Sequence, residues 1–163
     1  MRRLAIVAAM LAALPVSADS DSHIRVKLTG FQEVPVVTTE GKGDLDARIS
    51  RDGLSIDYQL SYSGLQGQVR QAHIHVAQRS VNGAIVLWLC GTSFNPGPAG
   101  TQVCPQSGTV VGTLTAANLQ VSATQQVADF ADVVAAIRAG AAYANVHTDL
   151  SPGGEIRGQV GHH

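Results

Sequence analysis

Apolar and polar residues alternate through most of this chain, and this period of two limits the fold more than any other feature of the sequence. Successive side chains of a strand point to opposite faces of a sheet, so each alternating run predicts a strand with one buried and one solvated face. Glycines at the junctions predict tight turns. The expected strands are residues 23–28, 44–49, 54–61, 69–76, 84–89, 109–114, 143–148 and 155–160.

One segment, residues 127–139, departs from this alternation. Its apolar residues recur at helical spacing, at Val127, Phe130, Val133, Val134 and Ile137. Gly140 follows and is a typical helix stop. About eight short strands with glycine turns, together with one short helix near 127–139, predict an all-β sandwich or barrel.

The chain length and composition exclude several classes of protein. A length of 163 residues fits one domain. Charged residues make up 14%, aromatic residues 4%, and the formal net charge is −1, so a nucleic-acid partner is not expected. An apolar content of 45% argues against disorder.

Residues 1–18 have the pattern of a secretory signal peptide. Arg2 and Arg3 precede an apolar run over residues 4–14, and small residues around Ala18 offer a cleavage site. The run is shorter than the roughly 20 residues of a membrane span. We therefore expect a periplasmic or secreted protein without a membrane span, whose single domain covers residues 19–163.

Export would place Cys90 and Cys104 in an oxidising compartment, where they can pair. A disulfide across this loop of about 15 residues is worth roughly 3 kcal/mol in the chain-entropy model. The loop between the two cysteines is rich in proline and glycine, so a covalent staple has an obvious purpose there.

Three of the six histidines are candidates for a site. His73 and His75 lie two apart on one expected strand and share a face, while His147 lies on another strand with Asn145 on its face. In each strand the apolar residues occupy the opposite face, so the histidines are expected on solvated faces, as is Arg157. The other three, His23, His162 and His163, lie near the chain ends, where we expect solvated residues of no assigned role.

Two imidazoles at positions i and i+2 can bind one metal ion, and a third from a neighbouring strand completes a three-nitrogen site for zinc, copper, iron or nickel. Asn145 and Glu155 are the candidate outer-shell acceptors. The imidazoles must be neutral to bind, so affinity is expected to fall below about pH 6. The same pattern also fits ordinary surface or hydrogen-bonding histidines. Catalytic alternatives are weaker, because no G-x-S-x-G motif is present. Paired carboxylates could be Asp44/Asp46 or Glu33/Glu40, but the first pair alternates with core residues and fits a solvated strand face better.

Several motifs together resemble the CHRD domain, a family named for chordin and found also in exported bacterial proteins. The resemblance implies a Greek-key β-sandwich of extracytoplasmic proteins with no established reaction, so the partner would be a metal ion or an extracytoplasmic protein. The matching residues are Gln32–Pro35, Gly64–Leu65, Ala72–His75, Cys90, Cys104–Gly108, Tyr143–Thr148 and Pro152–Gln159.

The chain has a more distant resemblance to copper/zinc superoxide dismutase, an eight-stranded Greek-key barrel with copper on its outer wall. The resemblance implies that His73, His75 and His147 bind copper and that Arg157 guides the anion. No candidate for a bridging histidine or a zinc loop is found, and the cysteine pair is local. We therefore expect a binding module with a three-histidine copper site. The alternatives are a dismutase-like oxidoreductase and a metal-free interaction module, and the oligomeric state is open.

Overall fold

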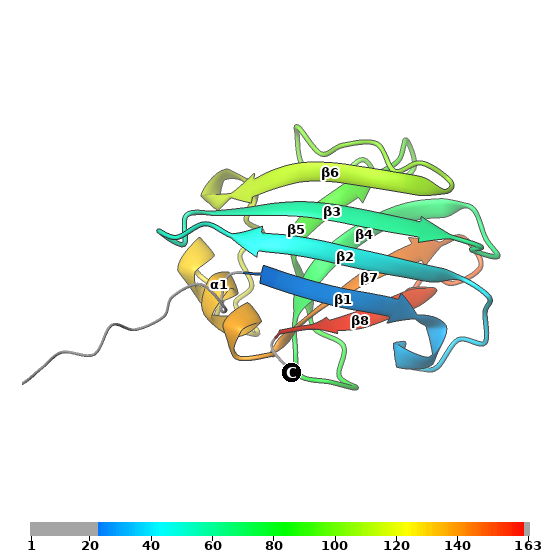
Figure 1. Cartoon of the computed structure of the whole chain (residues 1–163), viewed down its shortest axis with the longest axis horizontal. Helices are drawn as coiled ribbons and strands as arrows, with labels where there is room; N and C mark the ends of the chain where they lie inside the picture. Colours follow the sequence, from blue (N-terminus) through cyan, green and yellow to red (C-terminus); the bar gives the residue numbers. More distant parts are fainter. Residues whose placement is uncertain (1–22, 162–163) are drawn as a thin grey trace, which may run out of the picture.

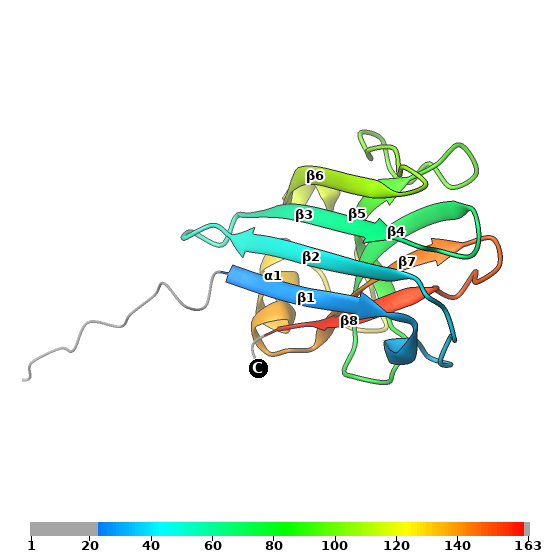
Figure 2. The same cartoon turned by 45° about the vertical axis from the view of Figure 1, so that its right-hand side comes forward.

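All eight strands predicted from the alternation are present in the computed structural model, which describes residues 23–161. One sheet curls into a nearly closed barrel, and the single α-helix lies at one end of it (Figures 1 and 2). The elements are β1 His23–Thr29, β2 Lys42–Ile49, β3 Ser55–Ser63, β4 Val69–Val76, β5 Ala84–Gly91, β6 Gly108–Thr115, α1 Phe130–Arg138, β7 Ala142–Thr148 and β8 Ile156–Val160, with short 3-10 turns at Gly30–Gln32 and Ala116–Asn118.

The strands follow the order β5-β4-β7-β8-β1-β2-β3-β6, and every neighbouring pair is antiparallel. Strands β1 to β3 form a meander, whereas the β3–β4 and β6–β7 connections join strands that are not neighbours. This is the connectivity expected of a Greek-key barrel, and the predicted all-β fold class is confirmed.

The two halves of the sheet are buried differently. Burial alternates residue by residue along β1, β2 and β3, so their outer face is solvated as predicted. Every residue of β7 and β8 is buried, and so are four consecutive residues of β4, from Ala72 to His75. A second buried layer therefore lies on the outside of the barrel, over these three strands.

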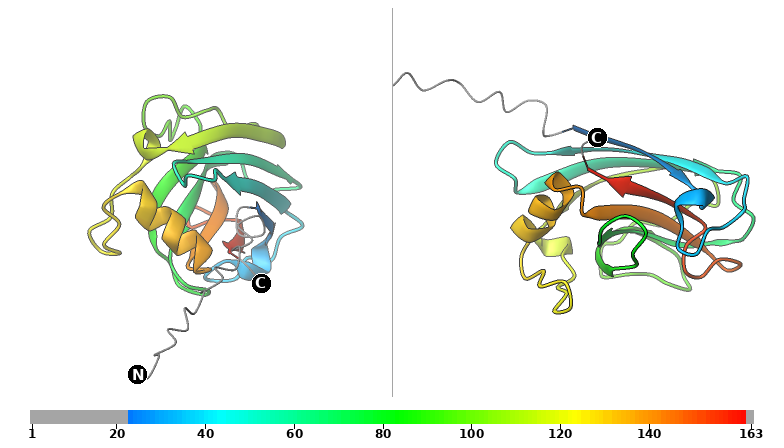
Figure 3. Two further views of the ribbon diagram at one scale, coloured as in Figure 1. Left: turned by 60° about the vertical axis from the view of Figure 1, so that its left-hand side comes forward. Right: turned by 90° about the horizontal axis from the view of Figure 1, so that it is seen from below.

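Helix α1 closes one end of the barrel (Figure 3, left). It begins at Phe130, later than the predicted residue 127, because Asp129 forms a capping box with Asp132. The chain leaves the helix at Gly140, whose φ of 69° favours glycine. The apolar face of the helix, from Phe130 to Ile137, packs on the barrel core.

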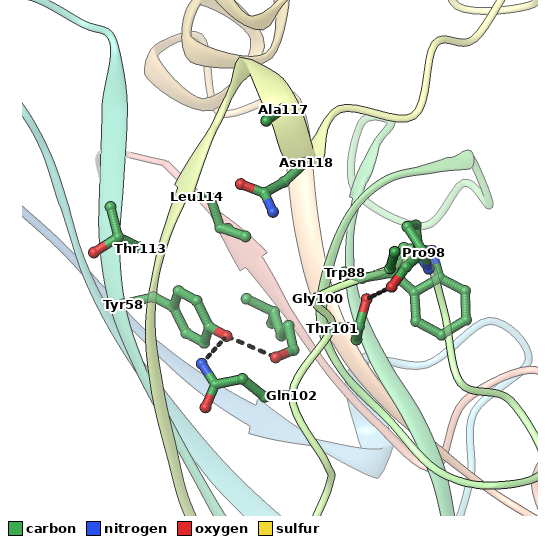
Figure 4. A pocket seen from close by; sticks show the side chains of 12 residues that line it. Tyr58, Trp88, Pro98, Gly100, Thr101, Gln102, Thr113, Leu114, Ala117 and Asn118 are labelled. Atoms are coloured by element: carbon green, nitrogen blue, oxygen red, sulfur yellow. Dashed lines mark hydrogen bonds between the residues drawn. The ribbon is translucent and has the colours of Figure 1, made fainter.

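The seam of the barrel lies between the edge strands β5 and β6. The predicted Cys90–Cys104 disulfide is confirmed, and it fixes the loop segment that covers the β5 edge. There the Gly91 N–H donates to the Gln102 carbonyl (2.8 Å) and the Cys104 N–H donates to the Gly91 carbonyl (2.8 Å). A small pocket at this seam is lined by Tyr58, Trp88 and Gln102, among others (Figure 4).

No helix in residues 23–161 is long and apolar enough to cross a membrane. The predicted signal peptide and the residues His162 and His163 lie outside the described part of the chain. His23 is exposed but is not a free tail residue, because it begins β1 and its Nε2 lies 2.7 Å from Asp46 Oδ1.

Candidate metal centre

The three predicted histidines converge. His73 and His75 come from β4 and His147 from the adjacent strand β7. One nitrogen from each ring lies within 4.8 Å of the other two. Strand pairing alone therefore brings together residues 74 positions apart in the sequence. This group could hold a metal ion.

The expectation that these side chains face solvent is wrong. The exposed fractions of His73, His75 and His147 are 0%, 5% and 6%. The sheet face was assigned correctly, since Ala72 and Ile74 point into the core, but loops cover the outer face. The loop between β4 and β5 crosses beneath β7 (Figure 3, right), and the β7–β8 turn covers the other side.

Two carbonyl groups fix the tautomers of two rings. His75 Nδ1 lies 3.0 Å from the Gly83 carbonyl oxygen, and His147 Nδ1 lies 2.9 Å from the Pro152 carbonyl oxygen. A carbonyl oxygen can only accept a hydrogen bond, so both Nδ1 atoms carry the proton. In the neutral rings the Nε2 atoms therefore present lone pairs toward the centre of the group.

Burial keeps the three rings neutral. Desolvation, together with a smaller effect of the neighbouring His147, lowers the pKa of His73 to about 2 and that of His75 to about 4. Burial also lowers the pKa of His147, partly opposed by its bond to Pro152. Neutral imidazole is the form that binds a metal ion.

The third ring is held differently. His73 Nδ1 lies 3.2 Å from His147 Nε2, while His73 Nε2 has no hydrogen-bond partner among the described residues. Trp88 packs edge-on against His73, with ring centroids 4.3 Å apart. Trp88 also lines the seam pocket, so this one side chain contacts both His73 and the pocket (Figure 4).

Of the two predicted outer-shell residues, Asn145 contacts the histidines directly. Its Oδ1 lies 3.0 Å from both His75 Nε2 and His147 Nε2.

The second candidate acceptor, Glu155, does not contact the histidines. Its buried carboxylate accepts hydrogen bonds from the Thr39 and Thr148 hydroxyls and from the Gln66 and Gly67 N–H groups. Glu155 therefore ties loops to the barrel.

Arg157 is adjacent to the group but is fully engaged. Its guanidinium donates to the Val81 carbonyl (2.9 Å) and to Asn82 Oδ1 (3.1 Å), and it stacks 3.4 Å from the Tyr143 ring centroid. Arg157 is only 1% exposed and is among the largest fully buried side chains. Tyr143 in turn stacks on His75, with ring centroids 4.5 Å apart.

Glu33 also belongs to this region, although the sequence suggested it only as a partner of Glu40 and not as a neighbour of the histidines. It is 4% exposed, and burial raises the pKa of its carboxyl to about 7 against the opposing effects of Arg157 and Asn145. The Asn145 amide lies close enough to the Glu33 carboxyl to lower its pKa. Glu33 Oε1 nevertheless has no hydrogen-bond partner within residues 23–161. Its sequence signals are its place in the Gln32–Pro35 motif and its pairing with Glu40, and neither of them places it beside the histidines.

The barrel and its motifs together point to one domain family. The model of the CHRD domain matches residues 24–160, which is nearly the whole described chain. The chain therefore belongs to the CHRD domain family. Searches of curated proteins and of solved structures returned no match.

The buried ionisable groups predict that the metal-free protein loses stability in mild acid. Below pH 6.5 the unfolded chain takes up protons on His73 and His75 that the folded chain does not, so these histidines lower stability as pH falls toward 4. The lowered pKa of His147 acts in the same direction. Glu33 acts oppositely between pH 4.5 and 7, because only the folded chain holds its proton there. His73 and His75 against Glu33 leave a net of nearly one proton, which gives a loss of at least about 1 kcal/mol from pH 6 to pH 5. Urea unfolding with a strong chelator measures this, and equal stability at the two pH values would contradict it.

Proposed function

We propose that this CHRD domain is an exported metal-binding module whose ligands are His73, His75 and His147 and whose ion is copper. The observation that carries the proposal is the convergence of lone pairs. Two backbone carbonyls hold the Nδ1 protons of His75 and His147, so both Nε2 atoms are left as ligands aimed at one place. Outer partners of this kind orient histidines in metal sites.

Copper is favoured by the kind of donor present. The two cysteines are paired in the disulfide, so no thiolate is available, and the described carboxylates form no hydrogen bond with His73, His75 or His147. Imidazole sites accept copper and zinc, and copper(II) binds most tightly among the divalent first-row ions. The disulfide also fits an oxidising compartment, where a carrier or buffer for copper would work.

A dismutase-like reaction is the less favoured alternative. Anion guidance needs a cationic side chain open to solvent. Arg157 is instead buried against Val81, Asn82 and Tyr143. We therefore propose binding without a redox reaction, and a metal-free interaction module is the outcome that the following experiment would reveal.

Metal loading tests the proposal directly. The mature protein is reconstituted with Cu(I), Cu(II) and Zn(II) in turn, and its metal content is measured by native mass spectrometry after exchange into metal-free buffer. We expect one equivalent of copper, retained in the presence of excess zinc. No retained ion of any kind would overturn the proposal and direct the search to a protein partner.

Burial alters the pH dependence expected from the sequence. Three exposed histidines with a pKa near 6.5 would lose about 4,000-fold in affinity from pH 6.5 to pH 5, roughly 16-fold each. The pKa of His75 near 4 and that of His73 near 2 remove this competition. We expect a loss of at most about 400-fold, which combines a share of about 25-fold from Glu33, with its pKa near 7, and a share below 16-fold from His147, whose pKa is lowered by burial. Zn(II) titration against a chelator at both pH values distinguishes the two cases.

A further inference from the structure

We propose that Asn145 supplies a fourth ligand, its Oδ1 atom, to the three-histidine centre, and that Glu33 is the positioning residue that holds the amide in this orientation. The inference rests on the proposed metal centre and adds its coordination number and its donor set. It concerns one hydrogen-bonding conflict that the protein alone does not resolve.

The conflict lies between Asn145 and two of the rings. Oδ1 is 3.0 Å from His75 Nε2 and 3.0 Å from His147 Nε2. Both nitrogens present lone pairs, since each Nδ1 proton is given to a carbonyl group. An amide oxygen has no proton to donate, so neither contact is a hydrogen bond between neutral groups. His73 Nδ1, 3.2 Å away, can donate to His147 Nε2, but no donor serves the contact between Oδ1 and His75 Nε2. Acceptors at this distance in a buried place are costly unless a cation lies among them.

Rotating the Asn145 amide by 180° would give His75 Nε2 and His147 Nε2 a donor. The groups on the opposite side of the amide disfavour this rotation. Asn145 Nδ2 lies 3.5 Å from the Gly153 carbonyl oxygen, and the Glu33 carboxyl faces the same amide. If Oδ1 were turned outward it would face a carbonyl group and a carboxylate, which are both acceptors. The oxygens of the Gly153 carbonyl and of the Glu33 carboxyl on this side of the amide therefore favour the orientation that presents Oδ1 to the histidines.

The backbone makes room for this contact at Gly154. Its φ is 126°, and a Cβ atom there would lie 2.1 Å from Glu33 Oε1 and 2.7 Å from Asn145 Nδ2. The carboxyl and the amide thus meet in the space that a side chain would fill. Arg157 supplies the charge that favours an ionised Glu33 in this buried setting. Arg157 thus acts on Glu33, Glu33 acts on Asn145, and Asn145 contacts the histidines of the metal centre.

The donor set bears on the choice of ion. Three imidazole nitrogens and one amide oxygen suit a four-coordinate divalent ion, whereas Cu(I) prefers softer ligands. We therefore expect the centre to favour Cu(II) and Zn(II) over Cu(I) when Asn145 is present. Losing the oxygen should weaken the divalent ions and leave Cu(I) nearly unchanged.

The first test compares Zn(II) and Cu(I) affinities of the wild type with those of Asn145→Ala and Glu33→Gln. Each variant should weaken Zn(II) by about 10- to 100-fold, the range found for residues that orient metal ligands. Glu155→Gln is the matched control, since it neutralises another buried carboxylate that contacts none of the histidines. The visible absorption of bound Co(II) reports the donor set, and it should change in Asn145→Ala and stay unchanged in Glu155→Gln.

The second test is a rescue. Asn145→Asp presents an oxygen whichever way the group turns, so Glu33→Gln should cost no more than about threefold in that background. In the protein that retains Asn145, Glu33→Gln should lower the Zn(II) affinity by at least about tenfold. Equal Zn(II) affinity and equal Co(II) spectra in the wild type and in folded Asn145→Ala would overturn the inference while leaving the three-histidine centre intact. Failure of the wild type to bind any ion would instead remove the proposed function.

Discussion

A variant that carries His73→Ala and His147→Ala is expected to bind Cu(II) and Zn(II) more than about 100-fold more weakly than the wild type. Changing an outer-shell partner alone costs 10- to 100-fold, and this variant removes two direct ligands. The effect should also appear in stability. At a free metal concentration of 100 times the dissociation constant, binding adds about 2.7 kcal/mol to the free energy of unfolding of the wild type, and the variant should lose that gain. Chelator competition and thermal unfolding with and without metal measure the two effects.

His23→Ala is the matched control for this variant. His23 lies on the exposed face of β1, where it contacts Asp46 and none of the three central histidines. Its removal should change neither the affinity nor the metal-dependent stability. If the double variant and this control retain the same affinity, the bound ion lies elsewhere on the chain and the three-histidine centre is refuted.

Arg157→Met is expected to give the largest loss of stability in the metal-free protein, about 3–5 kcal/mol. Methionine keeps most of the side-chain volume but removes two hydrogen bonds and the charge that opposes the burial of Glu33. The cost comes chiefly from the buried groups that are left without a partner. Urea unfolding of the chelator-treated protein at pH 8, where Glu33 is ionised, measures the loss.

Two further variants check the cause of that loss. Arg25→Met removes an arginine that is 76% exposed and pairs with Asp46, so it should cost less than about 1 kcal/mol. Adding Glu33→Gln to Arg157→Met should restore part of the lost stability, because the unpaired carboxylate is then neutral. A double variant that is less stable than Arg157→Met alone would show that Glu33 and Arg157 stabilise the fold independently.

The fold was largely predictable, because the alternation carries physical information about which face is buried. Ile24, Val26 and Leu28 all point into the core, as their spacing requires. The helix was predicted from the same kind of pattern, and only its first turn was wrong, since a cap at Asp129 outweighs the apolar Val127. The pairing of Cys90 with Cys104 followed from compartment and loop length.

The site was predictable in its ligands but not in its environment. Two-residue spacing places His73 and His75 on one face, and strand order places His147 beside them. Their burial depends on loops far away in the sequence, which contribute Gly83 and Pro152. The alternation within β4 and β7 carries no information about which loops cover the outer face of the sheet. Glu33 was missed as a neighbour of the histidines for the same reason.

The way the barrel is closed has a consequence for its behaviour in a crowded compartment. Strands β5 and β6 end the sheet, and unpaired edges are templates on which other chains can add strands. The disulfide-anchored segment occupies part of the β5 edge through Gly91, and the Gln120 N–H donates to the Val86 carbonyl farther along it (2.9 Å). Gln102 caps the Val111 carbonyl of β6. The staple therefore does more than shorten a loop: it shields the molecule from edge-to-edge aggregation, and a reduced chain would lose that protection before it lost its core.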